Sequence, residues 1–242
     1  MQQSVAFLAS VCYNFVMKYD FILFDADDTL FDFQKTAEKC FSETCKKMGV
    51  PYKEGYYQIY RDINQGYWDL YSVGKVEKAV LKRMRFVDFG KAIGHEIDAD
   101  KFMPVYEQGL SEISILYPES IPTLEKVKEL GIKIYLITNG LANVQRGRLK
   151  LSGIGKYFDG IFISDEMGCS KPSKTYYDLV VSQIDGFNPK KALIVGDSLV
   201  SDIPLGIENG VDTCYLNHTN EKTDLPITYE IKNVSKVLNV IK

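Results

Sequence analysis

The sequence has few histidines and few paired cysteines, which several common classes of functional site require. It holds only two histidines, His95 and His218, which lie far apart, so a histidine-bound metal or a histidine general base has poor support. The five cysteines are odd in number and irregularly spaced, and no Cys-x-x-Cys pair indicates a zinc or redox centre. We therefore expect reduced thiols and a cytoplasmic location.

Long apolar runs and an excess of positive charge are also missing. No segment approaches the roughly 18 consecutive apolar residues that cross a bilayer, so we expect a soluble protein. The 29 Lys and Arg residues nearly balance 32 Asp and Glu residues, and the net charge of −3 offers no broad positive surface to a nucleic-acid backbone. We expect no nucleic-acid polymer and no membrane as partner, but a small-molecule substrate and a monomer or weak homo-oligomer.

The first 16 residues are similar to an export signal only in their short apolar stretch. They contain no charged side chain, so no Lys or Arg precedes the apolar part, and no Ala-x-Ala cleavage site follows it. We interpret residues 1–16 as an N-terminal extension. A chain that begins at Met17 is expected to stay soluble and active.

Five short apolar segments each end in polar residues, a pattern typical of strands buried in a parallel sheet. These segments are residues 21–24, 132–137, 160–163, 192–195 and 213–216. Amphipathic helical patterns between them cover residues 123–130, 144–151, 175–183 and 201–209. The alternation predicts an α/β fold, with a parallel sheet covered by helices on both faces.

Residues 33–118 interrupt this alternation. Four helical patterns and no convincing strand occupy them, at residues 34–48, 56–71, 77–93 and 99–114. A chain of 242 residues, somewhat more than one average domain, has room for such an inserted helical module. We therefore predict a core of residues 17–32 and 119–242, interrupted by a helical domain of residues 33–118.

Acidic residues follow two of the predicted strands. Asp25 and Asp27 come after the first, and Asp197 and Asp202 come after the fourth. Each group alone has an ordinary interpretation, as a polar turn or a helix cap. In a parallel sheet, however, the carboxyl ends of the strands share one edge, where ligands bind. Four carboxyl groups around one crevice repel one another unless they share a hard divalent cation, which indicates Mg²⁺.

Residues suited to binding phosphate follow other strands at the same predicted edge. Thr138 and Asn139 offer a hydroxyl and an amide, and Lys171 offers a cation on a loop stiffened by proline. Taken singly, an Asn-Gly turn and a surface lysine are the ordinary interpretations. Together with Asp25 and Asp27, which can supply a nucleophile and a general acid, they indicate chemistry on a phosphate ester.

Four segments, in this order, resemble the motifs of the haloacid dehalogenase superfamily. Residues 25–30 (Asp-Ala-Asp-Asp-Thr-Leu) are similar to its first motif, Thr138-Asn139 to its second, Lys171-Pro172 to its third and residues 196–202 to its fourth. The likeness covers the chain from about Tyr19 to its end. It implies a Rossmann-like core in which residues 33–118 form the α-helical cap domain of the family.

The resemblance also implies a reaction. Asp25 would attack phosphorus to form an aspartyl-phosphate, while Asp27 protonates the leaving alcohol and then activates water. The resemblance thus implies a magnesium-dependent phosphatase that acts on a small phosphomonoester. Dehalogenases of the family lack the second aspartate, so Asp27 favours the phosphatase.

Further roles are carried over with the motifs. Mg²⁺ would be held by Asp25, by the backbone carbonyl of Asp27 and by Asp197. Asp202 would support these ligands without binding the metal itself. The resemblance also implies that Thr138, Asn139 and Lys171 bind the phosphate.

Within the superfamily, the first motif together with Asn64, Trp68 and Arg85 is similar to the pyrimidine 5′-nucleotidase branch. This implies a pyrimidine nucleoside 5′-monophosphate as substrate, contacted by Asn64 and Trp68, although aromatic residues at helical spacing are equally consistent with packing. A phosphosugar or phosphoglycolate phosphatase stays open, because the cap selects the substrate. A haloacid dehalogenase and a non-catalytic phosphate-binding regulatory module are the further alternatives, disfavoured by intact Asp25 and Asp27.

Overall fold

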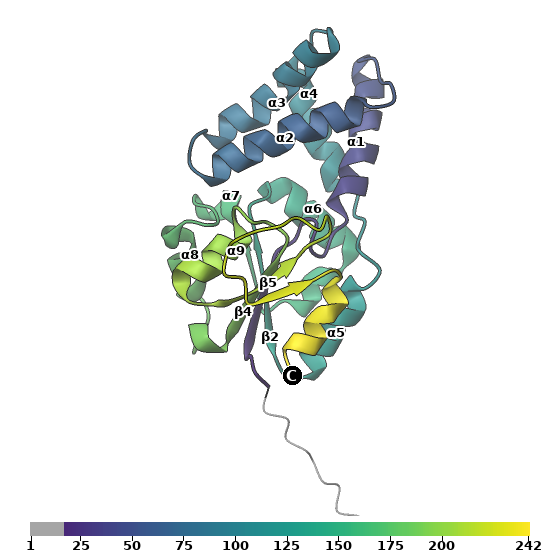
Figure 1. The fold of residues 1–242 in the computed structure, drawn as a ribbon. Helices are drawn as coiled ribbons and strands as arrows, with labels where there is room; N and C mark the ends of the chain where they lie inside the picture. The colour runs from purple at the N-terminus through teal and green to yellow at the C-terminus, as the bar shows by residue number, and fades with distance from the viewer. Residues whose placement is uncertain (1–16) are drawn as a thin grey trace, which may run out of the picture.

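The computed structural model describes residues 17–242, so the expectations for the N-terminal extension fall outside it. Within that range, six strands form one parallel sheet in the order β3-β2-β1-β4-β5-β6 (Figure 1). They are β1 (Phe21–Phe24), β2 (Lys133–Thr138), β3 (Gly160–Ile163), β4 (Ala192–Gly196), β5 (Asp212–Leu216) and β6 (Tyr229–Ile231). The predicted α/β fold is confirmed.

Helices cover both faces of the sheet. The α-helices of the described residues, of which the first four stand apart from the faces of the sheet, are α1 (Phe33–Met48), α2 (Tyr56–Ser72), α3 (Lys78–Ile93), α4 (Ala99–Ser111), α5 (Ser120–Glu129), α6 (Ala142–Ser152), α7 (Ser164–Met167), α8 (Lys174–Val181), α9 (Asp202–Asn209) and α10 (Val237–Val240). Ile22 and Phe24 of β1 join the core that contains side chains of α5, α6 and α10. Phe21 and Leu23 point to the opposite face, into the core with α8 and α9.

The inserted helices α1 to α4 stand above the carboxyl ends of the strands and have a core of their own (Figure 1). At its centre Phe41 of α1 stacks on Tyr60 of α2, with ring centroids 4.1 Å apart, and Tyr60 stacks on Phe86 of α3 at 5.5 Å. Asp32 begins α1 by accepting a hydrogen bond from the Lys35 N–H at 3.1 Å. All four predicted helical patterns of the insertion are therefore helices.

The observed elements differ from the predicted ones at the edges of the fold. The sixth strand, β6, was not predicted, because it has three residues and Glu230 at its centre is exposed. The short helices α7 and α10 were also missed, since four residues are too few to show a helical period. α4 ends at Ser111, before the predicted residue 114. Among residues 17–242, no helix has the length and apolar character to span a membrane.

Candidate active site

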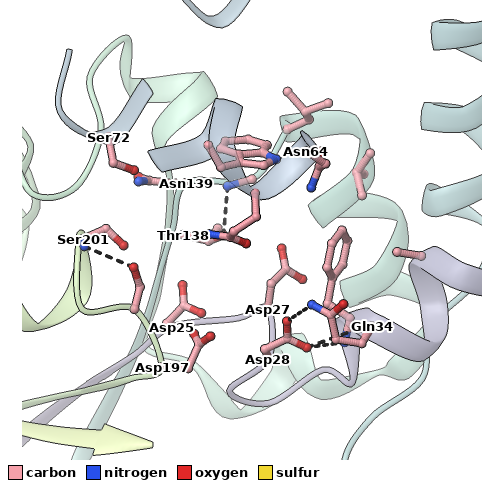
Figure 2. A pocket seen from close by; sticks show the side chains of 18 of the residues that line it. Asp25, Asp27, Asp28, Gln34, Asn64, Ser72, Thr138, Asn139, Asp197 and Ser201 are labelled. Carbon is pink, nitrogen blue, oxygen red and sulfur yellow. Dashed lines mark hydrogen bonds between the residues drawn. The ribbon is translucent and has the colours of Figure 1, made fainter. Parts of the chain in front are cut away.

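Side chains that follow β1, β2 and β4 converge at one edge of the sheet, beneath the inserted helices (Figure 2). β1 pairs with both other strands, so Asp25 at its end lies between Thr138, the last residue of β2, and Asp197, which follows β4. The Asp25 N–H donates to the Val195 carbonyl at 2.8 Å, which extends the pairing of β1 and β4 through Asp25 itself. The backbone of the sheet therefore sets the position of this carboxylate.

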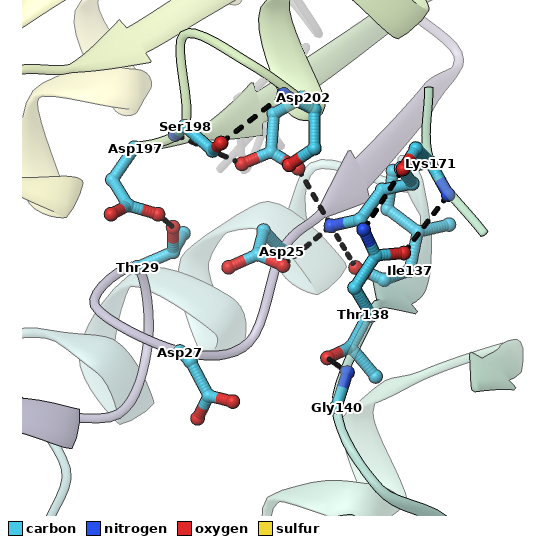
Figure 3. A network of polar contacts seen from close by, with 12 residues as sticks. Asp25, Asp27, Thr29, Ile137, Thr138, Gly140, Lys171, Asp197, Ser198 and Asp202 are labelled. Carbon is cyan, nitrogen blue, oxygen red and sulfur yellow. Dashed lines mark hydrogen bonds and ion pairs between the residues drawn. The ribbon is translucent and has the colours of Figure 1, made fainter. Parts of the chain in front are cut away.

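Lys171 connects two of the carboxylates from the loop between α7 and α8 (Figure 3). Its Nζ donates to Asp25 Oδ1 and to Asp202 Oδ1, both at 2.6 Å, and to the Ile137 carbonyl at 2.9 Å. Only 1% of Lys171 is exposed, and all three donors of the ammonium have acceptors. The Ser198 N–H donates to the other oxygen of Asp202 at 3.1 Å. Lys171 is thus a buried cation of the site, not a surface lysine.

Burial and mutual repulsion favour the protonated form of two carboxyl groups, those of Asp25 and Asp197. Removal from water raises the pKa of Asp25 to about 7, against the opposing charge of Lys171 and with the help of the Asp202 and Asp27 charges. Desolvation, and next the charge of Asp25, raises the pKa of Asp197 well above its usual range. Burial alone would lower the pKa of Lys171, but the Asp202 and Asp25 carboxylates raise it, so the ammonium stays charged.

The acidic cluster fits a hard divalent cation. One carboxylate oxygen from each of Asp25, Asp197 and Asp202 lies within 4.8 Å of the other two. Both oxygens of Asp202 already accept hydrogen bonds, from Lys171 and from Ser198, so Asp25 and Asp197 are the better placed to bind metal. A donor set made only of oxygen suits Mg²⁺ and disfavours zinc or copper. A cation here would also relieve the repulsion between the two carboxylates.

Asp27 lines the same cavity but has a different set of partners. Gln145 Nε2 donates to its Oδ2 at 2.6 Å, and the Arg148 guanidinium donates to its Oδ1. Its side chain is 28% exposed, whereas that of Asp25 is 9% exposed. The two aspartates after β1 are therefore each paired with a separate buried cation, Lys171 for Asp25 and Arg148 for Asp27.

Thr138 and Asn139 differ in what they can offer to a phosphate. Thr138 Oγ1 accepts from the Gly140 N–H at 3.1 Å, which leaves the hydroxyl proton available to donate. Asn139 instead binds the backbone of Lys171. Its Oδ1 accepts from the Lys171 N–H and its Nδ2 donates to the Lys171 carbonyl, both at 2.9 Å. The Asn139 side-chain amide is therefore occupied in orienting the Lys171 loop, and its expected phosphate contact stays a prediction.

A cavity of about 170 Å³ lies between these carboxylates and the inserted helices. Asn64 and Trp68, the two residues of α2 expected to contact a substrate, both line it. Arg85 of α3 is buried, and its NH1 donates to Asn64 Oδ1 at 2.8 Å. Because Oδ1 accepts from arginine, the amide nitrogen of Asn64 is the group left to donate, and it points down toward the carboxylates in Figure 2.

Sequence reasoning missed three residues at this edge. Gln145 and Arg148 of α6 are polar residues in an amphipathic pattern, yet both are fully buried. Their spacing of three places them on one helix face, but nothing in the sequence shows that this face meets Asp27. Asp28, next to the predicted pair, accepts hydrogen bonds from the backbone N–H groups of Phe33 and Gln34 and so supports the start of α1.

Several known proteins are similar to this chain over nearly their whole length. A family model described as haloacid dehalogenase-like hydrolase matches residues 19–210. The pyrimidine 5′-nucleotidase PynA of Streptococcus pneumoniae is 31% identical over 93% of this chain and 96% of its own. The pyrimidine 5′-nucleotidase YjjG of Escherichia coli is 29% identical over 91% of this chain and 97% of its own. The crystal structure of the HAD-hydrolase YfnB of Bacillus subtilis, bound to magnesium, superposes with a TM-score of 0.87 and 30% identity, covering 93% of this chain and 99% of that one.

Proposed function

The chain belongs to the haloacid dehalogenase-like hydrolases, and from this membership we propose that it is a magnesium-dependent phosphatase of pyrimidine nucleoside 5′-monophosphates. The observation that carries the proposal is the pair of aspartates, Asp25 and Asp27, each held by its own buried cation beside one cavity. The names of two relatives, both pyrimidine 5′-nucleotidases, support the choice of substrate.

In the first half of the proposed reaction, Asp25 attacks phosphorus with the carboxylate oxygen that Lys171 does not hold. A bond forms between this oxygen and phosphorus, and the bond from phosphorus to the ester oxygen breaks. Asp27 donates its proton to the departing alkoxide, which leaves as the alcohol. The Lys171 ammonium offsets the negative charge of the phosphate and of Asp25, and the Thr138 hydroxyl donates to a phosphate oxygen.

In the second half, the aspartyl-phosphate on Asp25 is hydrolysed. Ionised Asp27 takes a proton from a water molecule, whose oxygen attacks phosphorus and releases inorganic phosphate from Asp25. Asp27 is then protonated again for the next turnover. Asp25, Asp197 and the backbone carbonyl of Asp27 are proposed to hold Mg²⁺, with Asp202 orienting Lys171 behind them. When bound, Mg²⁺ supplies positive charge that stabilises the transferring phosphoryl group.

The leaving group is proposed to lie against α2 and α3. Arg85 fixes the Asn64 amide so that its nitrogen donates into the cavity, which suits a carbonyl oxygen of a pyrimidine base. Trp68 on the same cavity wall offers a ring for the base to contact. An amide donor and an indole ring on one wall together suit a base that offers both a carbonyl oxygen and a planar face, which is why we favour the nucleotide over a sugar phosphate.

The protein is further proposed to work in a reducing, cytoplasmic environment as a monomer or weak homo-oligomer. Cys40, Cys45, Cys169 and Cys214 are all free thiols.

Asp27 favours a phosphatase over a dehalogenase, because loss of a halide ion needs no proton donor at that position.

Phosphate release from a panel of monophosphates tests the proposed function. We expect the highest kcat/KM with UMP and dTMP, lower values with ribose 5-phosphate and phosphoglycolate, and loss of activity on chelation of magnesium. Asp25→Asn, which is nearly isosteric, should lower turnover by on the order of 1000-fold or more, while cooperative unfolding is retained.

Other outcomes of the panel select the alternatives. Equal or higher kcat/KM with phosphoglycolate or a sugar phosphate would contradict the nucleotide as substrate. If no ester in the panel releases phosphate in the presence of magnesium, the non-catalytic phosphate-binding module is favoured.

A further inference from the structure

Arg148 is the largest fully buried side chain of the described residues, and it reaches the active site from α6. Its NH1 donates to Asp27, and its guanidinium lies over the rings of Phe31 at 4.2 Å and Phe33 at 5.5 Å. Within residues 17–242 its buried Nε and NH2 have no hydrogen-bond partner. The one side-chain hydrogen bond that Arg148 makes within this range is therefore to the Asp27 carboxylate, and its position over the two phenylalanine rings fixes the guanidinium there.

Gln145 binds the other oxygen of the same carboxylate. It lies three residues before Arg148 on the same face of α6, is fully buried, and donates from Nε2 to Asp27 Oδ2 at 2.6 Å. Its side chain fills the space where a Cβ of Gly140 would stand, so it has little room to move. Its Oε1 is buried without a partner among the described residues. One rigid helix thus supplies a separate donor to each oxygen of Asp27.

We propose that Gln145 and Arg148 are positioning residues that hold the Asp27 carboxylate where it exchanges a proton with the leaving oxygen; this inference rests on the proposed phosphatase function. A side chain that is more than a quarter exposed has alternative rotamers open to it, and two directed donors select one of them. Asp25 and Asp27 can then perform different tasks although they are two residues apart.

The dependence of the rate on the leaving group tests this inference. An alkyl ester such as UMP needs a proton on its departing oxygen, whereas p-nitrophenyl phosphate releases a stable phenolate that needs none. The quantity to compare is kcat/KM, because it includes only the steps up to formation of the aspartyl-phosphate and leaves out its hydrolysis. Misplacing the proton donor should therefore lower kcat/KM for UMP and spare p-nitrophenyl phosphate.

Gln145→Met is the decisive variant. Methionine keeps the size of glutamine, and it removes the donor together with the unpartnered Oε1, so the fold should be retained. We expect kcat/KM for UMP to fall by about 10- to 100-fold and that for p-nitrophenyl phosphate to change by less than about threefold. Arg148→Met should show the same selectivity, and Arg148→Lys, which keeps a charged donor, should recover part of the UMP activity. Arg146→Met is the control, because Arg146 lies on the same helix but is exposed and pairs with Glu166.

Two results would overturn the inference. An equal loss for both esters in a folded Gln145→Met protein would show a structural role, and unchanged kcat/KM for UMP in Gln145→Met would show that Asp27 does not depend on its donors. If Arg148→Met fails to fold, Gln145→Met decides alone. Failure of the proposed substrate is recognised separately in the wild-type protein: if it hydrolyses p-nitrophenyl phosphate but not UMP, the comparison is made with the alkyl phosphate it does accept. A wild-type protein inactive on every ester overturns both the function and the inference.

Discussion

Lys171 connects catalysis and stability through a single ammonium group. It is buried between the carboxylates of Asp25 and Asp202, which are themselves buried. Such an ion pair adds little net stability, because the cost of removing the charges from water offsets their attraction. Removing one partner of the pair lowers the stability strongly, because the remaining charges then lie in the interior without compensation.

We expect Lys171→Met to lower the free energy of unfolding by about 3–5 kcal/mol and to abolish phosphate release, because two buried carboxylates lose their shared cation. Urea denaturation at pH 7.5 without magnesium measures the first effect. Lys174→Met is the matched control: Lys174 pairs with Asp178 on the surface, and exposed ion pairs contribute little to stability. An unchanged urea midpoint for Lys171→Met would show that the two carboxyl groups do not need the ammonium.

At the scale of helices and strands, the contact between α6 and α4 joins the core to the inserted helices. Gly147 makes it possible, because a Cβ at this position would lie 2.5 Å from the carbonyl oxygen of Ser111 at the end of α4. Close by, Ser114 Oγ donates to the Arg148 carbonyl at 3.1 Å. The helix that holds Asp27 is therefore also the helix on which the insertion rests.

Two glycine-to-alanine substitutions distinguish the effect of this contact on the free energy of unfolding from the effect of helix propensity. Gly147→Ala should lower the free energy of unfolding by about 1–3 kcal/mol, because its methyl group forces α4 away from α6. Gly66→Ala in α2, where a Cβ meets nothing within 4 Å, should raise the free energy of unfolding by about 0.5–1 kcal/mol. Both are measured by chemical denaturation. Equal effects of the two substitutions would mean that α4 and α6 do not require this close approach.

In the molecule as a whole, the inserted helices and the sheet are packed around different hydrophobic cores, although Leu141 and Val144 just after β2 join the core of the inserted helices, and the cavity lies where the two parts meet. The buried acidic cluster belongs to the sheet. Because the pKa values of Asp25 and Asp197 are raised, these two carboxyl groups bind protons in the metal-free folded protein that the unfolded chain would release. In the absence of metal, the stabilising effect of these protons is therefore lost as the pH rises from about 4 toward the Asp25 pKa of about 7.

Magnesium should consequently raise the melting temperature more at pH 8 than at pH 5.5. At pH 5.5 the metal competes with protons on Asp25 and Asp197, whereas at pH 8 it relieves repulsion between ionised carboxylates. Thermal unfolding at both pH values, with and without magnesium, measures the difference. Asp197→Asn should lose most of the shift at pH 8. A shift that is equal at the two pH values would argue against these carboxylates as the metal ligands.

Much of the architecture follows from local patterns that the sequence displays. Short apolar strands such as residues 21–24 alternate with amphipathic helices, and this alternation is enough to predict a parallel sheet whose carboxyl ends meet at one edge. That geometry explains why Asp25, Thr138, Lys171 and Asp197 were expected together, and the structure places them together. Their catalytic roles stay predictions. The boundaries of the predicted domains also stay predictions.

Tertiary packing decided the features that depend on which side of an element meets which neighbour. The sequence alone determined that polar side chains follow the strands, but only the folded chain turns the Asn139 amide onto Lys171 and buries Gln145 and Arg148 against Asp27. The physical reason is that a helical period shows which residues share a face, whereas the partner of that face is chosen by contacts more than a hundred residues apart in the chain.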